Sequence, residues 1–166
     1  MSTDTTTSAV AASARFVSDF SMMLCADIDA ARFSDRLGTT INHPAFILGH
    51  LAYYAGVCVD LLGGNSGIED GEADLYQHGA ECLDDPSRYL AKDDAIALFQ
   101  SRMKQATDFI AKCSPEVLSQ SSKGTPFEQR VDTLEEIAGF MLIGHPMFHM
   151  GQISAWRRVA GMPPAG

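Results

Sequence analysis

Two histidines lie one helical turn apart near the C-terminal end of the sequence, in the segment GHPMFHMGQISAWRR. His145 and His149 are four residues apart, so on a helix their imidazoles project from the same face. Two imidazole nitrogens held side by side can chelate a divalent metal ion. Two ligands do not complete a site, so a third must come from another element.

His50, in the segment HPAFILGHLAYYAGVCVDLLGG, is the candidate third ligand. It occupies an inward position of a helical stripe, as His145 does on its own helix. The two stripes are Phe46, His50, Tyr53, Val57 and Leu61, and Leu134, Ala138, Met141, His145, Phe148, Gln152, Ala155 and Val159. Burying a neutral imidazole without a partner costs about 1–3 kcal/mol. One shared metal ion would offset that cost, although hydrogen-bonded core histidines would leave the same pattern.

Other polar residues lie close to this pattern. The segment HPMFH lacks the glutamate of a zincin motif, and the chain has no Glu-x-x-His of the ferritin type, so no general base is evident. Gln152 lies one turn beyond His149, while Tyr53 and Tyr54 lie one turn beyond His50. These three are candidates for orienting a group on the metal, but packing or a structural hydrogen bond is the favoured explanation of each.

Arg157 is a candidate for binding an anionic substrate, and the helix dipole explains a basic residue near the end of a helix equally well. His43 and His78 fall outside both stripes, so we expect them in loops or at the surface. The cysteines form no CxxC pair, which predicts no disulfide framework and small buried side chains at Cys58 and Cys113. A catalytic cysteine paired with a histidine remains an alternative.

Apolar periodicity predicts four helices that would position these residues, over about 8–30, 44–62, 92–113 and 133–161. No segment alternates with period two, so we expect an all-α protein without a sheet. The first helix should turn Phe16, Phe20, Met23, Leu24 and Ile28 to one side, and the third should bury Ile96, Phe99, Met103, Ala106, Ile110 and Cys113. Connections of roughly thirty and twenty residues precede the third and fourth helices, long enough to permit parallel neighbours.

Local signals set the expected helix ends. Gly38 is a plausible stop for the first helix, and the Gly63–Gly64 pair ends the second. Thr133 and Glu136 have the spacing of a capping box. Pro146 lies inside the last helix, where it removes a hydrogen bond and clashes with the preceding turn. We therefore expect a kink or a widened turn over 142–146.

Composition limits the function classes. A chain of 166 residues, 46% hydrophobic and 20% charged, fits one domain over 1–166. Its net charge of −9 disfavours binding to nucleic acid and to anionic membranes. The N-terminal sequence resembles no secretory signal, and no apolar run approaches the ~20 residues of a membrane span, so we expect a cytoplasmic protein.

Three segments resemble the DinB-like superfamily, also described as YfiT-type metal-dependent hydrolases. These segments are ILGHL, DDPSRYLAKDDAIALF and HPMFHMGQISAWRRVAG, and they span most of 41–161. The resemblance implies a four-helix bundle with long crossover connections, a divalent metal on His50, His145 and His149, and a homodimer. Pro146 departs from the usual motif.

The resemblance also implies an activity, because characterised members include thiol-dependent S-transferases and a thiol-dependent isomerase. Three imidazoles leave at least one coordination position open, as in catalytic rather than structural sites. Zinc or nickel would suit these ligands, and the open position would take water or a low-molecular-weight thiol, each activated by the metal. We expect an S-transferase or a hydrolase acting on a small molecule. The alternative is a non-catalytic bundle that binds a metal or small ligand.

Overall fold

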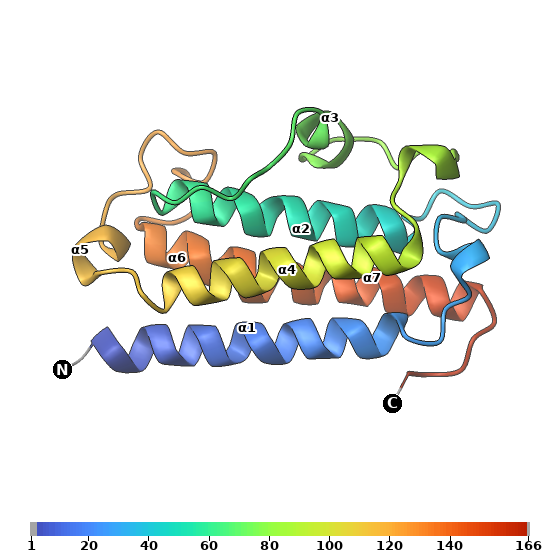
Figure 1. The fold of residues 1–166 in the computed structure, drawn as a ribbon, viewed down its shortest axis with the longest axis horizontal. Helices are drawn as coiled ribbons and strands as arrows, with labels where there is room; N and C mark the ends of the chain where they lie inside the picture. The colour runs from blue at the N-terminus through green and yellow to red at the C-terminus, as the bar shows by residue number, and fades with distance from the viewer. Residues whose placement is uncertain (1–2, 166) are drawn as a thin grey trace.

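The computed structural model describes residues 3–165, and every regular element in that range is helical (Figure 1). The all-α prediction is therefore confirmed for this range, where the only strand-like pairing is an isolated bridge between Ser121 and Thr133. The long helices are α1 (Thr3–Cys25), α2 (Pro44–Leu61), α4 (Lys92–Ile110) and a final run of α6 (Leu134–Gly139), η3 (Phe140–Gly144) and α7 (His145–Val159). The short ones are η1 (Ala30–Arg32), α3 (Glu72–Tyr76), η2 (Pro86–Arg88) and α5 (Pro115–Leu118).

The long helices lie side by side (Figure 1). The helix α1 and the final run point in one direction, whereas α2 and α4 point in the opposite direction. Because α2 and α4 are parallel neighbours, the connection over 62–91 returns along the length of α2 and carries α3 and η2. This is the arrangement that the length of the connection permitted.

The helix α2 forms the centre of the core. His43 is its N-cap and Pro44 its first residue, a position where proline's missing N–H is harmless. Several of its side chains are fully buried: Ile47, Leu48, Leu51, Ala52 and Ala55. Among residues 3–165, Pro44–Leu61 is also the one helix long and apolar enough to cross a membrane, and 72% of it is buried inside the protein. Core packing accounts for that composition.

The helix α1 ends earlier than the periodicity predicted. It ends at Cys25 rather than near residue 30, and Asp29 instead caps η1 by accepting the N–H of Ala31. A short acidic side chain that bonds to nearby backbone competes with helix continuation. The expected apolar side was also partly wrong, because Phe16 is 67% and Met23 is 40% exposed. Leu24 is buried as predicted, and the other buried residues of the helix are smaller ones: Ala11, Ala14, Val17, Ser21 and Cys25.

The widened turn expected before Pro146 is present as the π-helix η3. The N–H of His145 donates to the carbonyl of Phe140, five residues back, as in a π-helix. A π-turn holds about one residue more than an α-turn, so the inward face moves by one position. The predicted stripe is therefore wrong beyond this point: Phe148 is 68% exposed and Val159 is 54% exposed. The buried residues beyond the turn are Pro146, His149, Met150, Ile153, Trp156 and Arg157.

Candidate metal centre

The three predicted histidines meet between α2 and α7. The Nε2 atom of His145 lies 3.0 Å from the Nε2 atom of His50 and 3.0 Å from that of His149. Ligand atoms from all three lie within 4.8 Å of one another, which makes the cluster one that could hold a metal ion. His50 and His149 are buried, and His145 is half-buried. Packing of α2 against α7 thus brings together residues 95 positions apart in the sequence.

Hydrogen bonds fix the tautomers of two of these histidines. The Nδ1 atom of His50 lies 2.6 Å from the carbonyl oxygen of Tyr76, which can only accept, so His50 carries its proton on Nδ1. The Nδ1 atom of His149 lies 3.2 Å from Oε1 of Gln152 and donates to it. Both residues therefore turn the lone pair of Nε2 toward the centre of the cluster, as a metal ligand would.

The nitrogen positions match the size of a metal site. Metal–nitrogen bonds of about 2.0–2.1 Å separate two ligand nitrogens by about 2.9 Å in octahedral and about 3.3 Å in tetrahedral geometry. The two separations that involve His145, 3.0 Å each, lie within that interval, and the ligand atoms of all three histidines lie within 4.8 Å of one another. Because His50 and His149 carry their protons on Nδ1, a neutral His145 supplies at most one hydrogen to join the three Nε2 atoms. The Nδ1 atom of His145 is buried and has no hydrogen-bond partner within residues 3–165. The residues therefore fit a divalent cation.

Burial keeps the three imidazoles in the form that binds metal. Burial first, and the neighbouring histidines second, lower the pKa of His50 to about 4 and the pKa of His145 to about 3. Burial also lowers the pKa of His149, against an opposing effect of the Gln152 hydrogen bond. At neutral pH all three are neutral, as metal ligation requires. No carboxylate contributes to any of these pKa shifts.

Aromatic rings surround the cluster. The Tyr54 ring centroid lies 4.9 Å from that of His50 and 5.1 Å from that of His145. The Phe140 ring stacks on His145 at 5.5 Å, and the Phe148 ring meets His149 edge-on at 5.3 Å. These rings pack against the imidazoles and lower the local dielectric, which strengthens electrostatic interactions at the nitrogens.

The other predicted site residues take different positions. Gln152 contacts His149 directly, and its Oε1 atom lies 3.5 Å from Nδ2 of Asn42. Tyr54 lies against the cluster, and its hydroxyl accepts the backbone N–H of His78. Tyr53 packs on Tyr54 rather than on a cluster histidine. These contacts give Gln152 the strongest claim to a role in orienting a ligand.

Arg157 takes part in a structural network at the far end of α7. It lies eight residues, or about 12 Å along the helix, beyond His149. It is 2% exposed and forms a bidentate ion pair with Asp27. It also donates to the carbonyls of Leu24 and Pro163. Its guanidinium ties α7 to the end of α1 and to the C-terminal segment, so the structure gives it no contact with the histidine cluster.

One site group and one buried histidine were missed from sequence. The Tyr76 carbonyl is a backbone group in the acidic connection, and no side-chain pattern could have revealed it. The expectation that His43 lies at the surface or in a loop was wrong about burial: it is fully buried, and its Nδ1 accepts the N–H of Phe46. The position of His43 directly before Pro44, a proline suited to the start of a helix, was the signal that could have identified it as the N-cap. His78 is exposed, as expected.

The cysteines offer little support for thiol catalysis. All four are free within residues 3–165. Burial raises the pKa of Cys25 and of Cys58 to about 12, and it also raises the pKa of Cys82 and Cys113. Thiols with a raised pKa are poor nucleophiles at neutral pH.

Comparison of the chain with protein-family models, curated proteins and solved structures finds no match.

Proposed function

We propose that the chain is a DinB-like four-helix bundle that binds zinc or nickel through His50, His145 and His149. The observation that carries the proposal is the convergence of three Nε2 atoms, two of them with lone pairs fixed inward by hydrogen bonds. Three neutral ligands leave the full positive charge of the ion in place. Bound there, a divalent ion would act as a Lewis acid and lower the pKa of a coordinated water or thiol.

We propose further that the protein acts on a small molecule as a thiol-dependent S-transferase or a hydrolase. The contribution of the chain is to hold the imidazoles neutral and to pack the rings of Tyr54, Phe140 and Phe148 against them. The resemblance to thiol-using proteins favours a low-molecular-weight thiol as the second substrate.

A non-catalytic metal-binding bundle is the second candidate. The observation that favours it is the missing general base: among residues 3–165, no acidic side chain contributes to the pKa shifts of the three histidines. Turnover separates the two functions. Metal-loaded protein should accelerate the reaction of an electrophile panel with a small thiol, whereas a binding module would take up metal without turnover. Dependence of the rate on the thiol distinguishes a transferase from a hydrolase.

The metal itself is tested first. Untagged protein should contain about one zinc or nickel ion per chain by elemental mass spectrometry. His149→Ala should lose that ion, because two imidazoles remain. His78→Ala is the matched control, since it removes an exposed histidine outside the cluster. A wild-type ratio near zero that persists after incubation with both metals would contradict the proposal.

We also propose a homodimer, formed through an apolar face between α1 and the final helical run. A hollow of about 480 Å³ there is lined by Ala12, Ser13, Phe16, Val17, Ile143 and Met147. The run over 137–156 contains no charged residue. Two chains of net charge −9 repel least where such neutral faces meet. Two adjacent helices about 34 Å long offer roughly 700 Å², near the ~800 Å² per partner of stable interfaces.

A further inference from the structure

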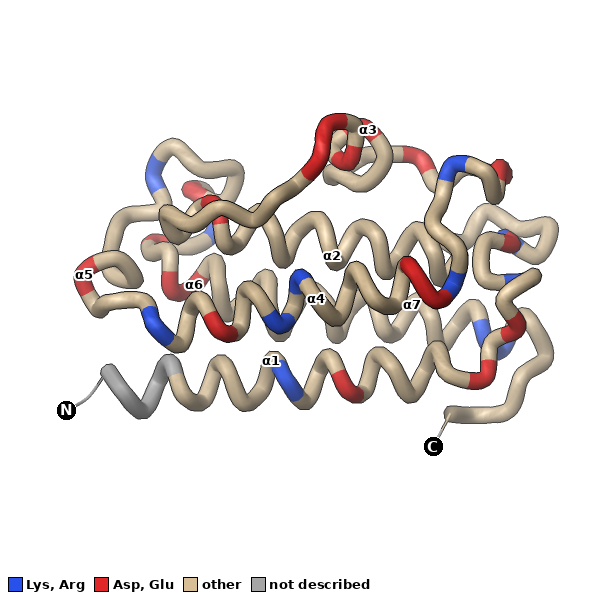
Figure 2. The backbone as a smooth tube through the Cα atoms, in the orientation of Figure 1, with Lys and Arg blue, Asp and Glu red and all other residues tan. Residues whose placement is uncertain are grey.

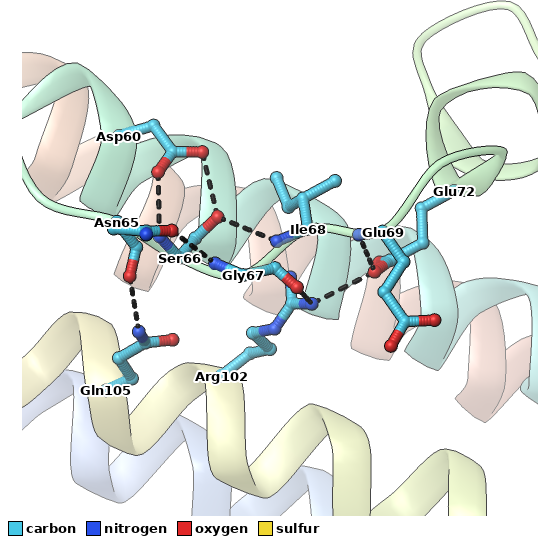
Figure 3. A network of polar contacts seen from close by, with 9 residues as sticks. All are labelled: Asp60, Asn65, Ser66, Gly67, Ile68, Glu69, Glu72, Arg102 and Gln105. Carbon is cyan, nitrogen blue, oxygen red and sulfur yellow. Dashed lines mark hydrogen bonds and ion pairs between the residues drawn. The ribbon is translucent and has the colours of Figure 1, made fainter.

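The part of the acidic connection over residues 66–76, which we call the strap, is fastened to α4 by a buried arginine (Figure 3). Arg102 is 6% exposed, and its Nη2 atom donates to the Gly67 carbonyl at 2.8 Å and to Oε1 of Glu72 at 2.9 Å. The same Glu72 oxygen accepts the backbone N–H of Glu69 at 2.8 Å. Removing either partner of a buried guanidinium–carboxylate pair is strongly destabilising, because the other charge is left buried and unpaired.

The start of the strap is fastened to α2. Both carboxylate oxygens of Asp60 accept hydrogen bonds from Ser66, one from its N–H and one from its hydroxyl, each at 2.8 Å (Figure 3). The Ser66 hydroxyl in turn accepts the N–H of Ile68 at 3.2 Å. The strap is therefore held by polar contacts to two different long helices.

Two glycines let the strap lie directly on the backbone of α2. A Cβ atom at Gly56 would lie 2.6 Å from Nη1 of Arg102 and 2.9 Å from a side-chain carbon of Ile68. A Cβ atom at Gly49 would lie 2.2 Å from the Tyr76 ring. The two glycines are seven residues apart and so share one face of the helix. That face receives both ends of the strap.

The strap ends at the group that orients His50. Glu72 and Tyr76 are the first and last residues of α3, one helical turn apart. Arg102 therefore holds one end of this turn, while the carbonyl at its other end accepts the Nδ1–H of His50 at 2.6 Å. Removing this acceptor would free the imidazole to rotate or change tautomer, and such outer hydrogen bonds typically contribute 10–100-fold to metal affinity.

We propose that docking of the strap and binding of the metal are thermodynamically coupled through His50, with Arg102 as the positioning residue. This inference rests on the proposed metal site. Coupling between two binding events is reciprocal. A loosened strap weakens metal binding, and a bound metal, by fixing His50, stabilises the strap by the same factor.

The first experiment measures zinc affinity in full-length variants by competition with a chromophoric chelator. Arg102→Met should weaken zinc binding about tenfold, because the Glu72 end of α3 is released. Gly56→Ala should act in the same direction by displacing Nη1 of Arg102. Lys104→Met is the matched control, since Lys104 lies on the same helix in an exposed pair with Asp108. Thr133→Ala controls for general loss of stability at a site remote from the strap.

The second experiment needs no variant. Hydrogen exchange of the wild-type protein, with and without zinc, should show about tenfold slower exchange at the amides of 66–77 when zinc is bound. Exchange at α5 should not change, because α5 packs mainly against α6. Zinc binding without protection of 66–77, or Arg102→Met that binds zinc as tightly as wild type, would overturn the coupling and leave the metal site intact. A wild-type protein that binds no metal would overturn both proposals.

Discussion

At the scale of single residues, the three cluster histidines are held in orientation by different contacts. His50 donates to a backbone carbonyl and His149 to the Gln152 amide, whereas Nδ1 of His145 is buried without a partner among residues 3–165. His145 is instead held by the backbone of η3 and by the stacked ring of Phe140. Its orientation therefore depends on packing, while the other two depend on hydrogen bonds.

Gln152 should matter to the metal more than to the fold. Gln152→Leu removes the acceptor for Nδ1 of His149, so we expect metal affinity to fall about 10–100-fold. Gln152→Glu keeps an acceptor oxygen at the same place and should retain most of the affinity. Chelator competition measures both. Equal affinities for wild type and Gln152→Leu would show that packing alone orients His149.

The second residue-scale prediction concerns His43. Burial lowers its pKa to about 4 from an ordinary value of 6.5. The unfolded chain takes up a proton below pH 6.5 while the folded protein does not. The stability contribution is therefore complete above pH 6.5 and is lost as the pH falls toward 4, by about 3 kcal/mol. His43→Asn keeps a side-chain acceptor at the N-cap and should flatten this dependence.

Urea unfolding from pH 4 to 7 measures the effect of His43. A chelator should be present, because protonation of the cluster histidines would otherwise also report loss of metal. The cluster histidines contribute a slope of the same sign, so the quantity of interest is the difference between His43→Asn and wild type. Identical slopes for the two proteins would contradict the assignment.

At the scale of elements, the sequence was most informative where helix signals are local. The bounds of α2 and α4 follow from Pro44, the Gly63–Gly64 pair and the apolar stripe centred on Phe99 and Met103. The inward face of α7 could not be predicted, because a fixed helical period cannot register the extra residue of η3. His145 and His149 remained predictable because their four-residue spacing lies wholly after that turn.

The capping box predicted at the start of α6 is present, with Glu136 accepting the N–H of Thr133 and Thr133 accepting the N–H of Glu136. Thr133→Ala should lower the free energy of unfolding by about 1 kcal/mol, because the N–H of Glu136 loses its acceptor and the reciprocal hydrogen bond of the capping box is weakened. Thr133→Ser, which keeps the hydroxyl, should be nearly neutral. Chemical denaturation measures both, and an unchanged Thr133→Ala midpoint would contradict the prediction.

At the scale of the whole molecule, charge is unevenly distributed. Acidic residues gather on the connection around α3, whereas the long helices α2 and α7 carry few charges (Figure 2). Exposed apolar side chains occur on α1 and α7, among them Phe16, Met147 and Phe148. Composition alone indicated the acidic character, but the position of the neutral face required the packing of α1 against η3 and α7.

Substitutions in this neutral face test the proposed homodimer. Light scattering should give twice the mass of the chain for the wild-type protein. Phe16→Glu combined with Met147→Glu should give a monomer, because four carboxylates would face one another across a two-fold axis. Arg158→Glu, at an exposed position outside the hollow, serves as the control. A monomeric wild-type protein would overturn the dimer.

The distance in sequence between His50 and His145 has a consequence for how the chain matures. An ion that binds both residues closes a loop of 95 residues, and it cross-links the chain as a disulfide would in a secreted protein. During synthesis the first ligand emerges long before the other two, and a lone imidazole holds an ion weakly. On the proposed metal site, loading would therefore be the closing event of biogenesis, because the ion would join α2 to α7 only after all three ligands have been synthesised.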